Sequence, residues 1–251
     1  MSARRARAAG PRTFALDIGA TLIKAAVLDA RGRPVAAPTQ ARTPRPAPPA
    51  AVLRAVMKLA AAAPRFNRVA VGFPGVVQDG VTRTAANLHP AWRGVDLGRR
   101  MERLTGRPVR VANDADVQGL GVVEGAGVEL VITLGTGIGS ALVLDGRLIP
   151  NLELGHHPFR NGRTYEQLLG DRALKRIGKS AWNNRLRAAV EMLRKTFNCR
   201  RLYLGGGNAR LIEKPLPRGV RAVRNIAGVL GCIRLWHPPR GTRALRRRAH
   251  R

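Results

Sequence analysis

The chain has 251 residues, of which 45 are Lys or Arg and only 15 are Asp or Glu, so its formal net charge at pH 7 is +30. Hydrophobic residues make up 45% of the sequence, which is enough for two modest globular domains, each with a core. No run of about 18 apolar residues is present, and no apolar segment follows the basic N-terminus. Neither a membrane span nor a secretory signal is indicated, and we expect a cytoplasmic protein.

The basic residues are spread over the whole chain. Four Arg lie in residues 1–12 and six in residues 237–251, which leaves 35 basic and 15 acidic residues in the body, an excess of 20. Two interpretations are open: a proteome rich in arginine, or a field that attracts a polyanion such as nucleic acid or polyphosphate. Under either interpretation, a carboxylate within a glycine motif is informative, because Asp and Glu are scarce in this chain. Cys199 and Cys232 are isolated and belong to no metal-spaced pair.

In chain order, apolar runs at 13–16 and 24–28 flank a glycine turn and predict a β-hairpin whose loop is Asp17–Thr21. Residues 38–50 are rich in Pro and Ala, so we expect an exposed connection there and no strand. The next predicted elements are a helix at 51–63, a strand at 69–71, a helix at 97–105 that Gly106 ends, and a strand at 109–112 that leads into Asn113 and Asp114.

The second half repeats this order. The predicted elements are a helix at 116–123, strands at 130–134 and 141–144, helices at 164–177 and 181–197, a strand at 201–204 and a helix at 226–236. Each half opens with a hairpin around a glycine loop, which favours an α/β fold with two similar lobes and a cleft between them. We expect a first lobe at 13–110, joined by the final helix 226–236, and a second lobe at 111–225. Basic tails at 1–12, which we expect to be disordered, and at 237–251 flank the lobes.

Four groups of motifs, in this order and at compatible spacing, resemble the ROK family of repressors, open reading frames and sugar kinases. They are Asp17–Lys24, Phe73–Val77 with Thr84–Leu88, Asn113–Val117, and Leu134–Ser140 followed by Glu153–His156. The resemblance covers about residues 13–236 and is strongest to the branch of polyphosphate/ATP glucokinases. It implies a two-lobed hexokinase/actin-like ATPase fold with a central cleft.

The resemblance implies two phosphate loops. The first contains Asp17, which would help to hold Mg²⁺, with Gly19, Thr21 and Lys24. Ala20 replaces a glycine of the family, and a Cβ there is unfavourable if the backbone needs a positive φ or if a phosphate must approach closely. The second loop is Gly135, Thr136 and Gly137, and the nucleoside side is Gly206 and Gly207, with 227–231. Each of the two phosphate loops, taken alone, is also compatible with a plain hairpin turn. The glycines at 206–207 and 227–231 are also compatible with tight packing of a helix against a strand.

A sugar hydroxyl must lose its proton as it attacks phosphorus, and a positioned carboxylate can accept it. By resemblance Asp114 is this base, whereas Asp116 has the alternative of capping the following helix. The residues that the resemblance assigns to the sugar, besides Asp114, are Gly75, Asn87, Asn113, Glu153, His156 and Glu166. Many family members bind zinc with this histidine and three cysteines, but residues 157–166 contain no cysteine, so we expect no zinc cluster.

The sequence therefore predicts a glucokinase-type phosphotransferase that uses Mg²⁺ and either ATP or polyphosphate, and the resemblance favours a homodimer. Nucleic acid is not an expected partner. The alternatives are an ATP-only hexokinase for another sugar, a catalytically weak sugar-binding protein, suggested by Ala20, and a sugar-responsive repressor. Such a repressor carries a DNA-binding domain ahead of the sugar-binding part, and about 12 residues precede the first strand here, so we do not expect this alternative.

Overall fold

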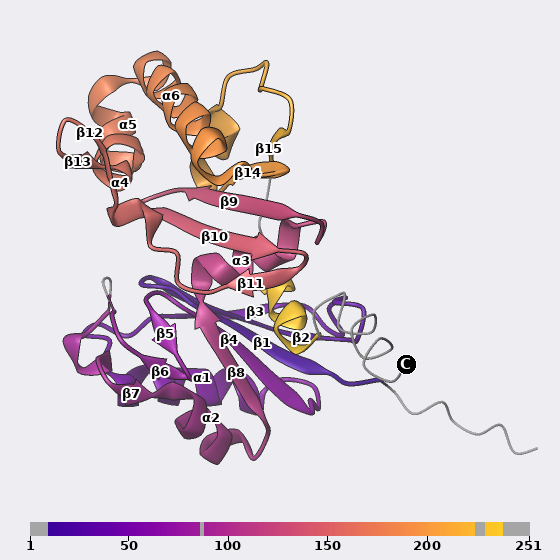
Figure 1. Cartoon of the computed structure of the whole chain (residues 1–251). Helices are drawn as coiled ribbons and strands as arrows, with labels where there is room; N and C mark the ends of the chain where they lie inside the picture. Colours follow the sequence, from indigo (N-terminus) through magenta and orange to yellow (C-terminus); the bar gives the residue numbers. More distant parts are fainter. Residues whose placement is uncertain (1–9, 86–87, 224–228, 238–251) are drawn as a thin grey trace, which may run out of the picture.

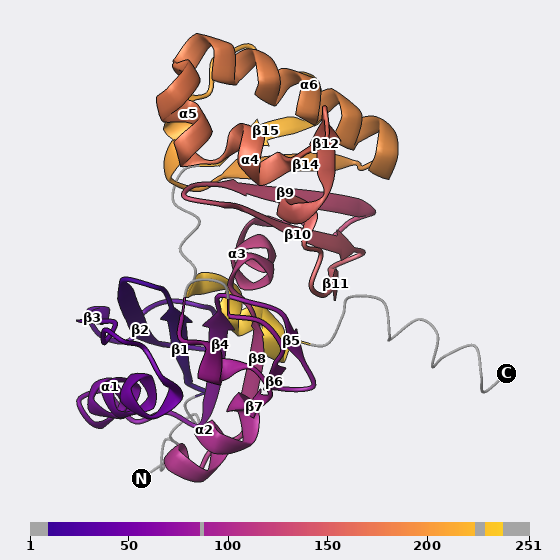
Figure 2. The same cartoon turned by 90° about the vertical axis from the view of Figure 1, so that its left-hand side faces the viewer.

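The structure is a computed structural model that describes residues 10–85, 88–223 and 229–237. Its framework consists of two five-stranded mixed sheets, one in each half of the chain, with a helical layer between them (Figure 1). A view turned by 90° shows the same arrangement, with the other helices on the outer faces of the two sheets (Figure 2). Asn87 and residues 227–228 lie outside the described residues, as do most residues of the two basic tails.

The first sheet has the strand order β3-β2-β1-β4-β8. Its strands are β1 (Thr13–Ile18), β2 (Leu22–Leu28), β3 (Thr39–Arg42), β4 (Arg68–Phe73) and β8 (Val109–Asn113). The predicted hairpin is confirmed, since β1 and β2 pair antiparallel, whereas β1, β4 and β8 run parallel. The lobe boundary expected at 110/111 falls inside β8, so residues 111–113 also belong to this sheet.

The expectation that 38–50 holds no strand is wrong. Residues Thr39–Arg42 pair antiparallel with β2 at the edge of the sheet. Three of the four residues are exposed, so the strand has no buried face and leaves no hydrophobic alternation in the sequence. Backbone pairing with a neighbour that is distant in the sequence defines this strand.

The second sheet has the order β11-β10-β9-β14-β15, which repeats the topology of the first. Its strands are β9 (Val128–Leu134), β10 (Ile138–Leu144), β11 (Arg147–Ile149), β14 (Arg201–Gly205) and β15 (Val220–Ala222). Strands β9 and β10 form an antiparallel hairpin, and β14 runs parallel to β9. The prediction that each half opens with a hairpin around a glycine loop is confirmed.

Helices and short strands cover the outer faces. The first sheet is covered by α1 (Pro49–Ala61), α2 (Leu97–Thr105), the one-turn helix η1 (Pro90–Trp92) and a small sheet of β5 (Val77–Gln78), β6 (Val81–Thr82) and β7 (Val95–Asp96). The second lobe carries α4 (Tyr165–Leu169), α5 (Asp171–Ile177), α6 (Lys179–Phe197), η2 (Leu154–His156), η3 (Gly207–Leu211) and the strand pair β12 (Pro158–Arg160) and β13 (Arg163–Thr164). The single helix expected at 164–177 is wrong, because Gly170 interrupts it with an extended ψ of 170°.

The layer between the sheets consists of α3 (Asp114–Val122) and η4 (Leu230–Trp236). Val117 of α3 packs with small residues of the first sheet, and Leu120 packs against the second sheet. Gly231 of η4 lies against the Val117 carbonyl, where any Cβ would collide. The final helix expected at 226–236 is 3₁₀-helical over its described part, and the helix expected at 116–123 begins two residues earlier.

Candidate active site

The candidate base lies where three parallel strands end side by side. Asp17 near the end of β1 pairs in register with Gly72 of β4, and Phe73 at the end of β4 pairs with Asn113 of β8. Asp114 is the next residue and begins α3. An added Cβ on Gly72 would lie 3.5 Å from the Asp114 Cα, so the chain passes closely here. Carboxyl ends of parallel strands thus bring Asp17 and Asp114 close together, and the charge of Asp17 acts on Asp114.

Asn113 is the cap of α3, so the alternative that Asp116 caps this helix is wrong. The Asn113 Oδ1 atom accepts hydrogen bonds from the backbone N–H groups of Ala115, at 2.8 Å, and Asp116, at 3.2 Å. Its Nδ2 atom donates to the Gly75 carbonyl at 3.2 Å and to Glu153 Oε1 at 3.4 Å. Asn113 therefore fixes the first turn of α3, and with it the Asp114 backbone, against the loops of both lobes.

A cavity of about 760 Å³ lies between the lobes in front of Asp114. Its lining combines residues of the first lobe, the start of α3, the β9–β10 turn and the loop before η2. The predicted site residues among them are Gly75, Asn113, Asp114, Gly135, Thr136, Gly137, Glu153, His156, Glu166 and Gly206. Within the part of the chain that the structure describes, the lining contains no Lys or Arg. A strongly basic protein thus presents an acidic cavity.

The carboxylates in and beside the cavity influence one another. Burial, together with the negative charges of Asp17 and Glu153, raises the pKa of Asp114 to about 6, although the Ala115 N–H group opposes this. Burial also raises the pKa of Asp17, and the neighbouring Lys24 ammonium acts in the opposite direction. Asp114 is therefore a stronger base than an ordinary aspartate and is still mostly ionised at neutral pH.

The turn between β9 and β10 forms the opposite wall. The Glu166 Oε2 atom accepts the Ile138 N–H at 3.2 Å and lies so close to Gly137 that a Cβ on this glycine would collide with it. The break at Gly170 lets the Asp171 N–H donate to the Gly135 carbonyl at 2.9 Å. A Cβ on Gly135 would meet no atom within 4 Å, so the space above this residue is open toward a ligand.

The first glycine loop lies outside the residues that line this cavity. The Thr43 hydroxyl donates to the Gly19 carbonyl at 2.6 Å, and the Thr43 N–H donates to Thr21 at 2.9 Å, so the chain after β3 supports the loop. Thr21 and Lys24 are exposed. Ala20 does not adopt a positive φ, so the strain expected from replacing a glycine is absent.

For the third glycine group, close packing is observed at Gly206, and contact with a nucleoside stays a prediction. Gly206 has a φ of +85° and lies against the Leu134 backbone, which leaves no space for a side chain and makes close packing one reason for it. Gly206 also lines the cavity, and the neighbouring Gly207 has open space above it. The sequence did not single out Asn151, which makes contacts behind the cavity, and its signal there is only a Pro-Asn turn ahead of Glu153.

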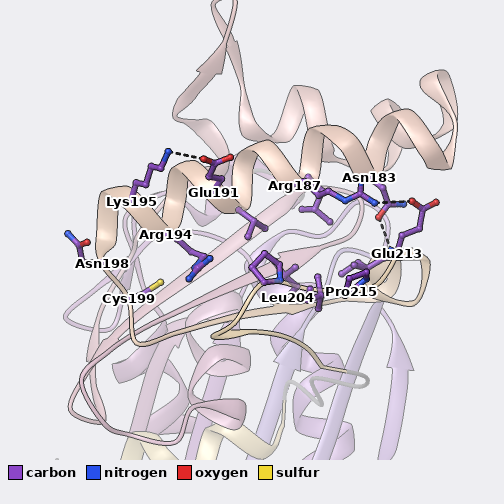
Figure 3. A pocket seen from close by; sticks show the side chains of 15 residues that line it. Asn183, Arg187, Glu191, Arg194, Lys195, Asn198, Cys199, Leu204, Glu213 and Pro215 are labelled. Atoms are coloured by element: carbon purple, nitrogen blue, oxygen red, sulfur yellow. Dashed lines mark hydrogen bonds and ion pairs between the residues drawn. The ribbon is translucent and has the colours of Figure 1, made fainter.

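Another cavity, of about 890 Å³, lies between α6 and the segment 212–217 (Figure 3). Arg187 and Glu213 form an ion pair at 3.4 Å across one end of it. It contains none of the residues predicted for catalysis or for substrate binding. The cavity in front of Asp114 is therefore the candidate active site, although it is the smaller of the two.

Comparisons with known proteins agree with this geometry. The ROK family model matches residues 13–168. The polyphosphate glucokinase of Mycobacterium leprae is 34% identical over 88% of this chain and 73% of its own length, and that of Mycobacterium tuberculosis H37Rv is 30% identical over 87% and 88%. The crystal structure of an inorganic polyphosphate/ATP-glucomannokinase from Arthrobacter sp. strain KM is 33% identical, with a TM-score of 0.80, and covers 91% of this chain and 100% of the Arthrobacter chain. The predicted two-lobed α/β fold is confirmed.

Proposed function

Because the chain belongs to the ROK family, we propose that it is a sugar kinase that converts glucose to glucose 6-phosphate with inorganic polyphosphate or ATP as the phosphoryl donor. The observation that carries this proposal is the position of Asp114. This carboxylate lies at a strand end and lines the cavity between the lobes together with candidate sugar-binding groups of both lobes and the second glycine loop.

In this mechanism the hexose hydroxyl attacks the terminal phosphorus of the donor. Its proton passes to the Asp114 carboxylate as the new P–O bond forms, and the bond to the rest of the donor breaks. The raised pKa of about 6 suits this role, because a stronger base accepts the proton more readily and most of the group is still ionised near pH 7.

The hexose half of the site would consist of Gly75, Asn113, Glu153 and His156, with Asn87 outside the described residues. The Glu153 Oε2 atom lies 3.7 Å from His156 Nε2, and both side chains are accessible from the cavity. A set of amide, carboxylate and imidazole groups recognises vicinal hydroxyls and rejects analogues that lack one of them. We assign Glu166 to this half by resemblance, and it also supports the second glycine loop.

The donor half would consist of Gly135, Thr136 and Gly137, with Gly206 and Gly207 beyond them and Asp17, Gly19, Thr21 and Lys24 from the first loop. Open space above Gly135 and Gly207 supports this assignment. Asp17 would hold Mg²⁺, because a cation would offset the cost of burying this carboxylate beside the Asp114 carboxylate. When bound, Mg²⁺ would neutralise the phosphate oxygens.

For the catalytically weak sugar-binding protein, the backbone-strain argument is absent, because Ala20 does not adopt a positive φ, and the close approach of a phosphate to the Ala20 Cβ is its other argument. An ATP-only hexokinase retains one supporting observation: the described cavity lining offers no Lys or Arg to a long phosphate chain. A cytoplasmic homodimer remains part of our proposal. Among the described residues, no helix is long and apolar enough to cross a membrane.

The test is a coupled assay for glucose 6-phosphate with ATP and long-chain polyphosphate measured side by side in the presence of Mg²⁺. We expect turnover with glucose and both donors. Turnover with ATP alone would support the hexokinase alternative, and absence of turnover with either donor would refute the proposed function.

A further inference from the structure

Asn151 connects the two lobes from behind the active-site cavity. It lies on the second lobe, two residues after β11, and its side-chain amide pairs with the backbone of Val77 in β5 of the first lobe. The Val77 N–H donates to Asn151 Oδ1 at 3.0 Å, and Asn151 Nδ2 donates to the Val77 carbonyl at 2.9 Å. One side chain thus makes the two hydrogen bonds that a paired strand residue would make.

The Asn151 backbone makes a third connection. Its N–H donates to Asp116 Oδ2 at 2.9 Å, and Asp116 is buried on α3 with a relative exposure of 1%. The other Asp116 oxygen is buried without a hydrogen-bond partner among the described residues. Asn151 is therefore the residue on which the Asp116 carboxylate depends for its hydrogen bonding.

Each of the three connected residues lies two positions from a residue of the cavity. Val77 lies two residues after Gly75, Asp116 lies two residues after Asp114, and Asn151 lies two residues before Glu153. Asn151 itself is absent from the cavity lining. The three segments that supply the hexose half of the site are thus joined by a single residue, through its side chain to Val77 and its backbone N–H to Asp116, and this residue does not line the cavity.

The residue type matches this task in two respects. Asn151 has a φ of +62°, in the left-handed region that Asn tolerates better than most residues other than Gly. The contact with Val77 also requires one donor and one acceptor on the same short side chain, which an amide supplies and a carboxylate does not. Glycine would accept the backbone conformation but lose both contacts, and aspartate would lose the donor.

We propose that Asn151 is a positioning residue for the hexose half of the active site: it fixes the loop that carries Glu153 relative to the loop that carries Gly75. This inference rests on the proposed assignment of that half to the sugar. Because Asn151 acts through those two loops, its removal weakens the binding of the hexose more than the binding of the phosphate donor. The β9–β10 turn on the donor side has its own support from Glu166 and Asp171.

The test compares Asn151→Gly with Asn161→Gly. Asn161 is a matched control, because it also has a positive φ, of 50°, and lies exposed in the turn between β12 and β13. For Asn151→Gly we expect the KM for glucose to rise about tenfold or more, with a KM for the donor within about twofold of wild type. Asn161→Gly is expected to leave both values unchanged. Glucose binding is also measured by calorimetry without donor, with the same loss expected.

Asn151→Asp is the second variant, in case the glycine variant does not fold. It keeps the backbone conformation and the acceptor, so we expect a loss of glucose affinity in the same direction. An unchanged glucose affinity in either folded variant, or equal losses for glucose and donor, would overturn the inference. Wild-type turnover with glucose tests the proposed function separately, and the calorimetric comparison of variants does not depend on turnover.

Discussion

At the scale of single residues, function depends on where the few carboxylates of this basic chain are buried. Asp114 and Asp116 both lie in the first turn of α3, yet their surroundings differ. Asp114 faces the cavity and is half-buried, whereas Asp116 is buried behind it and accepts the Asn151 N–H. Burial, with the charges of Glu153 and Asp114, raises the pKa of Asp116 to about 7. The sequence identified Asp114 by its motif, but it could not show that Asn113 rather than Asp116 caps the helix.

Replacing Asp114 by Asn tests its role as the base. We expect turnover to fall by about three orders of magnitude, while glucose affinity stays within a few-fold, because only the proton acceptor is removed. Steady-state kinetics and glucose calorimetry measure the two effects. Asp79→Asn is the control, since Asp79 is exposed and is not among the residues that line the cavity. Turnover close to wild type would remove Asp114 from the mechanism.

Replacing Asp116 by Asn tests the cost of burying its charge. The pKa of this group is about 7 in the folded protein and 3.8 in its reference state, so its ionisation disfavours folding above pH 7. The amide keeps an acceptor for the Asn151 N–H. We expect the free energy of unfolding of Asp116→Asn to exceed that of the wild type by about 1–2 kcal/mol at about pH 8. This advantage decreases as the pH falls from about 7 towards 4, because the native carboxyl group then takes up its proton. Urea unfolding at about pH 8 and pH 5 checks this, and equal differences at both pH values would contradict it.

At the scale of elements, the sequence predicted what local pattern determines and missed what distant pairing determines. Helix α2 has the predicted bounds, because an apolar face and Gly106, with a φ of +62°, define it locally. Strand β3 was missed because its residues are mostly exposed. The break at Gly170 was missed although its cause is partly local: a Cβ there would lie 2.8 Å from the Glu166 carbonyl and 3.0 Å from the carbonyl of the more distant Thr136. Tertiary contacts of this kind also placed Asn151 beyond the reach of sequence reasoning.

The second glycine loop allows a test at this scale. Gly135 lacks a positive φ and has open space above it, so Gly135→Ala fits the protein without bound donor. If phosphate occupies this space, the added methyl group hinders it, and we expect the KM for the donor to rise about tenfold with little change in Tm. The KM for glucose serves as the internal control. An unchanged donor KM would place the phosphates elsewhere.

At the scale of the whole molecule, the net charge of +30 and the acidic cavity act on different parts of a donor. The reacting end must enter a site that contains Asp114, Glu153 and Glu166. The rest of a long phosphate chain would stay outside, where the basic residues of the surface would attract it. ATP has no such extension and gains less from these residues.

This difference predicts a contrast in salt dependence. A polyanion held by many weak contacts releases counterions on binding and loses affinity steeply as salt rises. We expect the KM for polyphosphate to rise more steeply with KCl than the KM for ATP, at constant Mg²⁺. If the KM values for polyphosphate and for ATP rise equally with the KCl concentration, the surface charge takes no part in donor binding. The arginine-rich composition would then be a property of the proteome.

Helix α3 lies between the inner faces of both sheets and carries Asp114 at its first residue. Asp114 is therefore anchored through this helix to the cores of two lobes at once, whereas a residue on an outer loop is anchored to one lobe. The proton acceptor is thus positioned by two hydrophobic cores and not by a surface loop.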